Sequence, residues 1–175
     1  MPINEISTQI KKRNIAKDRV YTPIEVVKNH LKIVKEWIKE GDFIYEPFFG
    51  KGAYYNLYGE FFKNCNFDFS EIDLNKDFFK YDKKVDVICS NPPYSIIDKV
   101  LEHSIKLNPR LISYLLCFHA LTPRRIEYMN KAGYYLKHCY MLKIYEWYGI
   151  SLITTFEKSE DKKNCIDFDR IVYRI

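Results

Sequence analysis

Four consecutive residues near the middle of the chain have the types and order needed to hold an amino group for reaction. Asn91-Pro92-Pro93-Tyr94 follows the apolar, β-branched run at residues 85–90, which predicts a strand. The two prolines restrict the backbone and keep Asn91 out of helical geometry, so its carboxamide oxygen and the neighbouring carbonyl can point outward together. The ring of Tyr94 offers a flat face for stacking, which contributes about 1–3 kcal/mol in nucleic-acid sites.

The chemistry that such a tetrapeptide suits is transfer to an exocyclic amine. An aryl amine is a poor nucleophile because its lone pair is delocalised into the ring. Accepting both amine hydrogens favours the pyramidal geometry that attacks a sulfonium methyl group, so these acceptors stabilise the transition state more than the ground state. The nitrogen becomes cationic only after transfer, and therefore no strong base is required.

A second motif, Glu46-Pro47-Phe48-Phe49-Gly50-Lys51-Gly52, follows the short apolar run at residues 43–45. Open α/β sheets bind ligands at the carboxyl ends of their strands, and glycines there let the backbone approach a cofactor closely. Taken alone, the motif also fits an ordinary strand-to-helix turn. Because the tetrapeptide ends another strand at the same edge of the sheet, we favour a cofactor loop.

The elements that must position these motifs alternate between strands and helices. A helix is predicted from Pro23, with Thr22 as its cap and Gly41 as its stop, and Thr122-Pro123 begins another that Gly133 ends. Such alternation implies a mostly parallel sheet with helices on both faces. Strands are predicted at residues 43–45, 66–71, 85–90 and 111–118, around a turn at 146–149 and at an edge at 166–173, with further helices at 53–62 and 95–107.

Composition limits the chain to a single domain. It has 175 residues, of which 47% are hydrophobic, enough for one core and too few for two ordinary domains. The net charge of +5 favours a polyanionic partner only weakly. The five cysteines form no C-x-x-C pair and have no histidine at zinc-ligand spacing, so we expect no metal site. With no apolar leader and no run long enough to span a bilayer, we expect a soluble, cytoplasmic protein without membrane contact.

These motifs resemble those of the amino-methyltransferase superfamily, and more closely those of the DNA adenine-N6 methyltransferases. The Asn-Pro-Pro-Tyr tetrapeptide matches their catalytic motif in full, and the residues from Glu46 to Gly52 look like their cofactor loop, acidic-Pro-Phe-x-Gly-x-Gly. The segment Arg19-Val20-Tyr21-Thr22-Pro23 resembles the one that closes over the methionine end of the cofactor in the family. Asp77-Phe78-Phe79 resembles the element that holds the adenine of the cofactor.

The resemblance implies a Rossmann-like class I methyltransferase fold, an α/β architecture with a mixed, mostly parallel seven-stranded sheet flanked by helices. We expect one catalytic domain over residues 1–175, with residues 1–18 as an N-terminal extension and no separate target-recognition domain. The catalytic residues would be Asn91, Pro92, Pro93 and Tyr94. The implied cofactor is S-adenosylmethionine, and the residues predicted to bind it are Tyr21, Thr22, Pro23, Glu46, Pro47, Phe48, Gly50, Gly52, Asp68, Glu71, Asp77, Phe78 and Asn91.

The acid that would bind the ribose hydroxyls of the cofactor lies near the end of the second strand. Asp68, Glu71 and Asp73 all fit, and we favour Glu71, then Asp68. Only residues 72–76 separate Glu71 from Asp77, fewer than the usual intervening helix needs. This part therefore departs from the family pattern, and we expect an abbreviated cofactor site.

Two stretches are candidates for contact with nucleic acid. Arg124 and Arg125 begin a helix just past a strand end, where they would contact phosphate or simply be solvated. Trp147 and Tyr148 lie in the turn where the family places an aromatic residue against the flipped base. Ordinary hairpin aromatics are the alternative for this pair.

The predicted activity is methyl transfer from S-adenosylmethionine to the N6 amino group of adenine in nucleic acid, with DNA favoured over RNA. Relatives with the same tetrapeptide methylate RNA adenines or glutamine side-chain amides, and these remain alternatives. A non-catalytic subunit of the same fold is a third. Since no segment is long enough for a target-recognition domain, we expect specificity to be slight or to come from a partner chain, a homodimer or a structured RNA.

Overall fold

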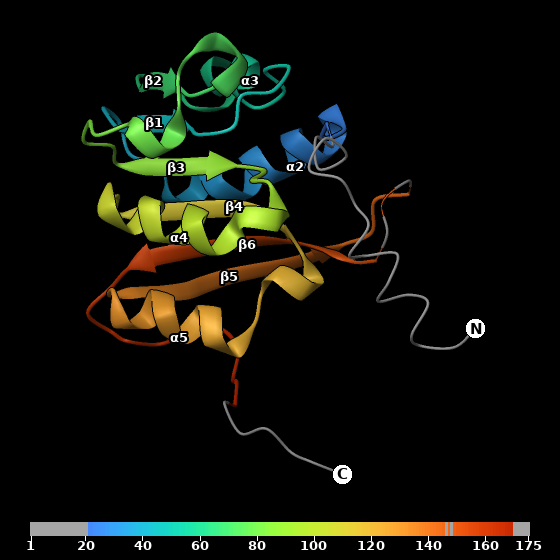
Figure 1. Ribbon diagram of the computed structural model, residues 1–175, viewed down its shortest axis with the longest axis vertical. Coiled ribbons are helices and arrows are strands. Elements are labelled where there is room, and N and C mark those ends of the chain that lie inside the picture. The colour runs from blue at the N-terminus through green and yellow to red at the C-terminus, as the bar shows by residue number, and fades with distance from the viewer. Residues whose placement is uncertain (1–20, 146, 148, 170–175) are drawn as a thin grey trace.

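The computed structural model describes residues 21–145, 147 and 149–169. At its centre is a six-stranded sheet in the order β2-β1-β3-β4-β6-β5 (Figure 1). The first four strands in this order are parallel, and β6 runs antiparallel to both β4 and β5. The mixed, mostly parallel sheet that the sequence predicted is thus confirmed. The strands are β1 Phe43–Glu46, β2 Asn66–Phe69, β3 Val87–Ser90, β4 Leu111–Cys117, β5 Tyr134–Leu142 and β6 Ser151–Lys158.

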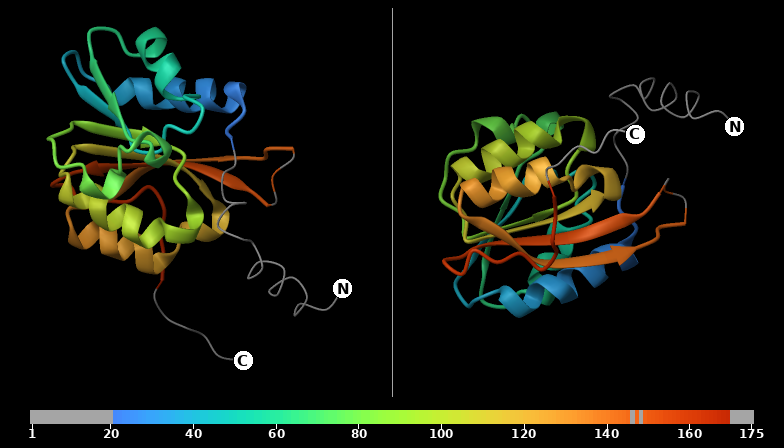
Figure 2. Two further views of the ribbon diagram at one scale, coloured as in Figure 1. Left: turned by 45° about the horizontal axis from the view of Figure 1, so that its top comes forward. Right: turned by 90° about the horizontal axis from the view of Figure 1, so that it is seen from below.

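Helices cover both faces of this sheet (Figure 2). Helices α2 (Ile24–Val34) and α3 (Tyr55–Phe61) pack on one face, and α4 (Ile97–Lys106) and α5 (Pro123–Lys131) pack on the other. Short 3-10 helices follow α2 at Lys35–Trp37 and occupy Ile72–Leu74, Phe78–Lys80, Tyr94–Ile96 and Phe118–Ala120. None of the described helices is long and apolar enough to cross a membrane.

Neighbouring residues of the central strands are buried on opposite faces, as the pleat requires. Ile44 and Val87 pack under α2 and α3, whereas Tyr45 and Ile88 pack under α4. Burial on both faces explains why these strands read as continuous apolar runs in the sequence. The central strands are therefore fixed in position, and their carboxyl ends form a rigid edge.

The sheet has six strands and not the seven that were predicted. Between β2 and β3 the chain forms two 3-10 helices, at Ile72–Leu74 and Phe78–Lys80, in place of the usual longer helix. The segment is too short for such a helix, as the close spacing of Glu71 and Asp77 predicts. The predicted strand that the described sheet lacks is the edge strand at residues 166–173, because residues 166–169 form no strand. The rest of that stretch lies outside the described residues.

The helix caps follow the sequence signals only in part. Thr122 caps α5 as predicted, since its hydroxyl accepts a hydrogen bond from the backbone of Arg125 at 3.4 Å. Thr22 was expected to cap α2, but the cap position is Pro23 and no side chain caps the helix. The hydroxyl of Thr22 bonds instead to a side chain from a distant loop. The sequence also offers Ser95 as a cap for the helix predicted from residue 95, but the cap position of α4 falls to Ile96.

Candidate active site

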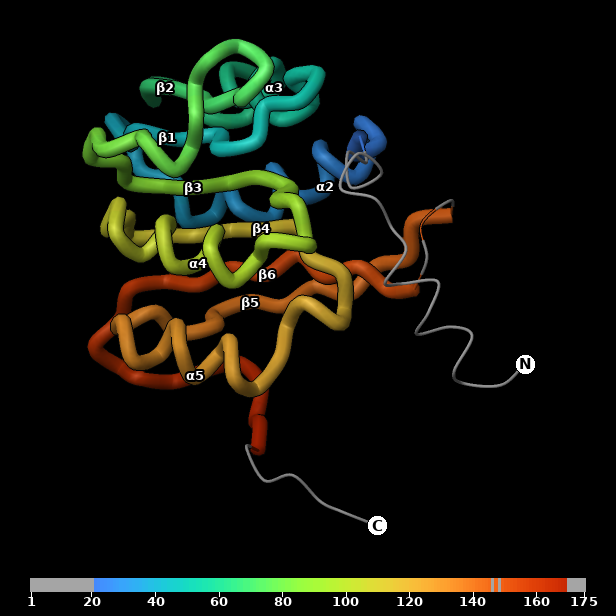
Figure 3. The backbone as a smooth tube through the Cα atoms, viewed as in Figure 1, coloured from blue at the N-terminus to red at the C-terminus, as the bar shows by residue number. Residues whose placement is uncertain are grey.

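The carboxyl ends of β1, β3 and β4 bring the two predicted motifs to one edge of the sheet (Figure 3). The glycine loop follows β1, and the tetrapeptide follows β3, its immediate neighbour. The hairpin formed by β5 and β6 extends past the same edge (Figure 3).

Asn91 is half-buried, and both ends of its carboxamide are held by hydrogen bonds. Its Nδ2 donates to the hydroxyl of Thr22 at 3.0 Å, and its Oδ1 accepts from the hydroxyl of Tyr94 at 3.0 Å. The Tyr94 hydroxyl also lies 3.3 Å from the backbone carbonyl oxygen of Leu115 in β4. The predicted catalytic side chain is thus connected to the segment that precedes α2 and to the neighbouring strand.

The glycine loop adopts a conformation that requires its glycines. Gly50 and Gly52 have φ angles of +54° and +78°, which other residues rarely adopt. A Cβ atom on Gly52 would lie 2.8 Å from Cζ of Phe49 and 2.7 Å from Nδ2 of Asn56. The backbone N–H of Gly50 donates to a carboxylate oxygen of Glu71 at 2.7 Å. The loop is therefore tied to the end of β2.

Tyr21, from the segment predicted to close over the cofactor, lies next to this loop. The Nζ of Lys51 is 4.3 Å from the centroid of the Tyr21 ring, within the range of a cation–π interaction. A Cβ atom on Gly50 would lie 3.6 Å from Cε1 of Tyr21. Tyr21 and Thr22 thus contact the glycine loop and the tetrapeptide, respectively. Pro23 lies between Thr22 and the first turn of α2.

The two favoured candidates for the ribose acid occupy different surroundings. Glu71 bonds to the glycine loop, and its other oxygen accepts from the backbone of Asp73 at 3.3 Å. Asp68 accepts hydrogen bonds from Lys83 at 3.2 Å and from Tyr81 at 3.1 Å. Burial alone would raise the pKa of Asp68, but its hydrogen bonds outweigh burial and hold the pKa below its usual value. The geometry therefore favours Glu71 as the acid nearest the loop.

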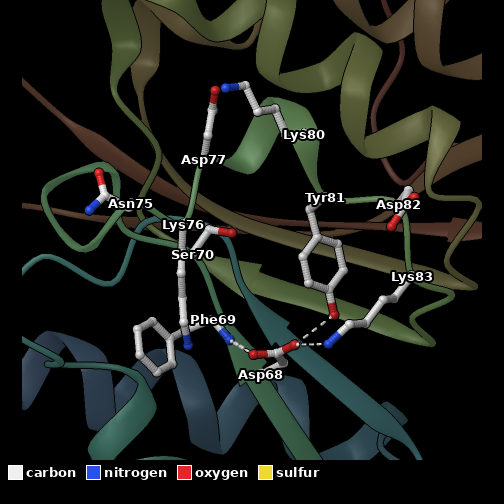
Figure 4. Close-up of a pocket in the computed structure, with 10 residues that line it drawn as sticks. All are labelled: Asp68, Phe69, Ser70, Asn75, Lys76, Asp77, Lys80, Tyr81, Asp82 and Lys83. Atoms are coloured by element: carbon white, nitrogen blue, oxygen red, sulfur yellow. Dashed lines mark hydrogen bonds and ion pairs between the residues drawn. The ribbon is translucent and has the colours of Figure 1, made fainter.

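Asp68 lies in a cavity of about 330 Å³ formed by β2 and the chain that follows it (Figure 4). Acidic and basic side chains alternate around this cavity. Its lining residues are Asp68, Phe69, Ser70, Asn75, Lys76, Asp77, Lys80, Tyr81, Asp82 and Lys83.

The predicted adenine-binding element divides between the surface and the core. The carboxylate of Asp77 accepts a hydrogen bond from the backbone of Phe79 at 2.9 Å and so caps a 3-10 turn. Phe78 is only 4% exposed. Its ring packs edge-on against the rings of Phe48 and His103, with centroids 5.1 Å and 4.6 Å apart, respectively. Phe79 is 41% exposed. Cofactor contact by Asp77, Phe78 and Phe48 stays a prediction.

Glu46 is fully buried at the end of β1, although it was predicted to contact the cofactor. Its carboxyl group is hydrogen-bonded to the hydroxyl of Ser90, to the backbone N–H of Phe48 at 3.2 Å and to the hydroxyl of Tyr58 at 3.5 Å. Burial raises the pKa of Glu46 to about 8, so the group is mostly protonated at neutral pH. Pro47 continues the chain from Glu46 into the loop.

The predicted nucleic-acid contacts have unequal surroundings. Arg125 donates to Asp98 at 2.7 Å and to the carbonyl oxygen of Ala120 at 3.0 Å, so it ties α5 to α4. Arg124 beside it is exposed. Trp147 is half-buried and packs against the apolar cluster that contains Leu115, and Tyr148 lies outside the described residues.

Sequence reasoning gave no role to His30, which lies in a buried polar network. Its ring nitrogens bond to the hydroxyl of Tyr54 at 2.8 Å and to that of Ser113 at 2.8 Å. Burial lowers the pKa of His30 to about 3, so the ring is neutral. A lone histidine on an apolar helix face is the only sequence signal for such a network.

Sequence reasoning also gave no role to Phe118, an aromatic residue at this edge of the sheet. Phe118 directly follows β4 and is 51% exposed, and its backbone N–H donates to the carbonyl of Ile150 at 2.8 Å. This bond fixes the backbone of Phe118 at the end of β4. In the part of the chain that the structure describes, no group of three or more His, Cys, Asp or Glu is placed to hold a metal ion.

No family model and no curated protein sequence matches the chain. Solved structures do match it, at low sequence identity. A precorrin-6y C5,15-methyltransferase from Geobacter metallireducens superposes with a TM-score of 0.59 and 15% identity over 81% of this chain and 91% of that chain. A Burkholderia thailandensis 1,6-didemethyltoxoflavin-N1-methyltransferase with bound S-adenosylhomocysteine gives 0.51 and 10% identity, over 90% and 86%.

A third match is a complex from E. cuniculi that is responsible for the methylation of a translation termination factor. It gives a TM-score of 0.56 and 15% identity over 79% of this chain and 98% of that chain. The chain therefore has the Rossmann-like fold of class I methyltransferases, as the sequence predicted.

Proposed function

We propose that the chain is an S-adenosylmethionine-dependent methyltransferase that acts on the N6 amino group of adenine in nucleic acid, with DNA the favoured substrate. One observation carries the proposal. The carboxamide of Asn91 is held by Thr22 and Tyr94 at a sheet edge, next to a loop whose glycines have positive φ angles.

The cofactor half of this edge fits S-adenosylmethionine, which when bound supplies a methyl group activated on a sulfonium ion. The crowding around Gly52 shows that the loop backbone leaves no room for a side chain, as in loops that approach a ligand closely. Glu71 lies beside this loop with carboxylate lone pairs that can accept from ribose hydroxyls. Tyr21 would cover the other side.

The acceptor half would hold the amine and its ring. Oδ1 of Asn91 and the adjoining backbone carbonyl would accept the amine hydrogens, and Tyr94 would stack on the ring. Phe118, exposed at the end of the neighbouring strand, offers a second aromatic surface for the target. The net charge of +5 and the exposed Arg124 favour a polyanion.

A protein amide is the second candidate substrate. The observation that favours it is the structural match to a complex that methylates a translation termination factor. That match also supports a partner protein as the source of specificity, and a homodimer would serve the same purpose. Adenine in RNA is a further candidate substrate, because it carries the same N6 amino group and would be methylated by the same chemistry.

Methyl transfer from labelled S-adenosylmethionine to unmethylated DNA, RNA and protein tests the proposal, with products digested and identified by mass. We expect N6-methyl-deoxyadenosine from the wild type and none from Asn91→Ala. Asn66→Ala, a change at an exposed asparagine at the start of β2, is the matched control and should retain activity. Labelled glutamine would move the assignment to protein, and no transfer to any substrate by folded protein would contradict the proposal.

A further inference from the structure

The glycine loop is held by two glutamates whose surroundings differ. Glu71 is half-buried at the rim and reaches the loop through the N–H of Gly50. Glu46 is fully buried beneath the loop. The sequence predicts cofactor contact for both residues, for Glu46 from its motif and for Glu71 from its place near the end of the second strand, but burial leaves Glu46 no surface through which to touch a ligand.

The contacts of Glu46 come from three separate parts of the fold. Its Oε1 accepts from the backbone N–H of Phe48 in the glycine loop, at 3.2 Å, and from the hydroxyl of Ser90. Its Oε2 lies 3.5 Å from the hydroxyl of Tyr58 in α3. Ser90 is the last residue of β3 and directly precedes Asn91. One carboxyl group therefore joins the cofactor loop to the strand end that carries the predicted catalytic residue.

Among the described residues, the groups that act most strongly on Glu46 include no positive charge. Burial raises the pKa of the Cys89 thiol and of the surrounding tyrosines, so these groups are neutral at pH 7. The carboxyl group of Glu71 also acts on Glu46 and raises its pKa. Burial likewise raises the pKa of Glu46 to about 8. A neutral carboxyl group can donate one hydrogen bond as well as accept several, which suits a link between polar groups. The titratable side chains that shift the pKa of Glu46, or whose own pKa is shifted by it, include Tyr45, Tyr54, Tyr58, Glu71, Cys89 and Tyr114.

We infer that Glu46 is a positioning residue that fixes the glycine loop against the strand end bearing Asn91 without touching the cofactor, and that Glu71 is the one of these two glutamates that faces the cofactor. The inference rests on the proposed function, which assigns the glycine loop to the cofactor and Asn91 to catalysis. It gives the two glutamates different roles, one in positioning the loop and one in binding the cofactor.

Calorimetric titration of S-adenosylhomocysteine into the wild type, Glu46→Gln and Glu71→Gln tests this assignment. Glutamine keeps the shape and hydrogen bonds of a neutral Glu46, so that variant should bind within about threefold of the wild type. Glu71→Gln removes a charged acceptor and should weaken binding about tenfold or more. Weaker binding by Glu46→Gln, equal to or beyond that of Glu71→Gln, would overturn the inference.

A second readout does not depend on cofactor binding. The amide signals of Phe48 and Ser90 in nuclear magnetic resonance spectra should titrate together with a midpoint near pH 8. They should stop doing so in Glu46→Gln and continue in Glu71→Gln. Amide signals that ignore pH, or that still titrate in Glu46→Gln, would contradict the inference. A wild type that binds no cofactor but keeps this titration would count against the proposed function alone.

Discussion

The cofactor half and the acceptor half of the proposed site differ in how far their side chains are already held. Around the glycine loop, polar groups are joined by hydrogen bonds, such as that between Gly50 and Glu71. At the ends of β4 and β5, large side chains lie open instead. Phe118 is 51% exposed, and Tyr145 is 96% exposed. We interpret the first half as preformed for a small molecule and the second as a surface that a larger target covers.

Gly52→Ala should give the largest effect and should be felt in the cofactor half. The positive φ costs roughly 1–2 kcal/mol for a residue with a Cβ, and the new atom would lie 2.8 Å from the Phe49 ring. We expect a loss of tenfold or more in cofactor affinity, on the order of 1.4 kcal/mol or more. Gly133→Ala has a similar φ of +86° with open space around it, so it controls for backbone strain. Equal cofactor affinity in both variants would contradict a preformed loop.

Tyr94→Ala should act on the acceptor half alone. Loss of the stacking face should lower kcat/KM, by raising the corresponding activation free energy by about 1–3 kcal/mol. The cofactor dissociation constant should stay unchanged. Tyr94→Phe keeps the ring and removes the hydroxyl bond to Asn91, so it should cost only about 1 kcal/mol. Steady-state kinetics and cofactor titration on the same preparations check both. A matching loss of cofactor affinity would show that the halves are not separate.

His30 joins the two halves from below, because it bonds to Tyr54 next to the loop and to Ser113 in β4. Burial lowers its pKa to about 3 in the folded protein, against 6.5 when unfolded. The unfolded state therefore binds more protons between these values, and stability is lost as pH falls below 6.5. Between pH 7 and pH 5 this amounts to about 2 kcal/mol.

Urea unfolding at the two pH values, in wild type and His30→Gln, measures this contribution. The variant should have a lower stability at pH 7 and a flatter dependence on pH. His119→Gln, a change at an exposed histidine, is the control and should behave like the wild type. The same slope in His30→Gln as in the wild type would exclude His30 as its source.

Thr22→Val should produce the smallest effect. It breaks a hydrogen bond that joins the two halves, between the segment before α2 and Asn91. It removes the hydroxyl that accepts from Asn91 at 3.0 Å while keeping the shape of the side chain. We expect kcat to fall roughly fivefold, which corresponds to an activation free energy higher by about 1 kcal/mol. Thr22→Ser, which keeps the hydroxyl, should retain activity. If Thr22→Val and the wild type have the same kcat, this hydrogen bond has no part in transfer.

Much of the fold and the placement of the two motifs followed from sequence. The runs that became β1 and β3 are apolar because both their faces are buried, and each is followed at once by its motif, so a common edge could be predicted. The absence of a longer helix between β2 and β3 had a signal as well, in the short spacing between Glu71 and Asp77. Local patterns therefore sufficed where the chain itself sets the geometry.

The remaining features depend on contacts between distant residues. Arg125 has the sequence context of a phosphate ligand, but its partner Asp98 lies on another helix, and only the packing of α4 against α5 brings them together. Thr22 precedes a proline as a helix cap does, yet its hydroxyl bonds to Asn91. Burial of Glu46 arises from three elements closing around it. No single stretch of sequence contains this information.

The most direct test of the account is to map backbone amide shifts by nuclear magnetic resonance, first with S-adenosylhomocysteine and then with an adenine-containing oligonucleotide. The account predicts that the first ligand shifts the signals of Gly50, Gly52 and Glu71, and that the second shifts those of Tyr94 and Phe118. Both ligands should move Asn91, which lies where the halves meet. Cofactor shifts confined to the Asp68 cavity, or no shifts in folded protein, would contradict it.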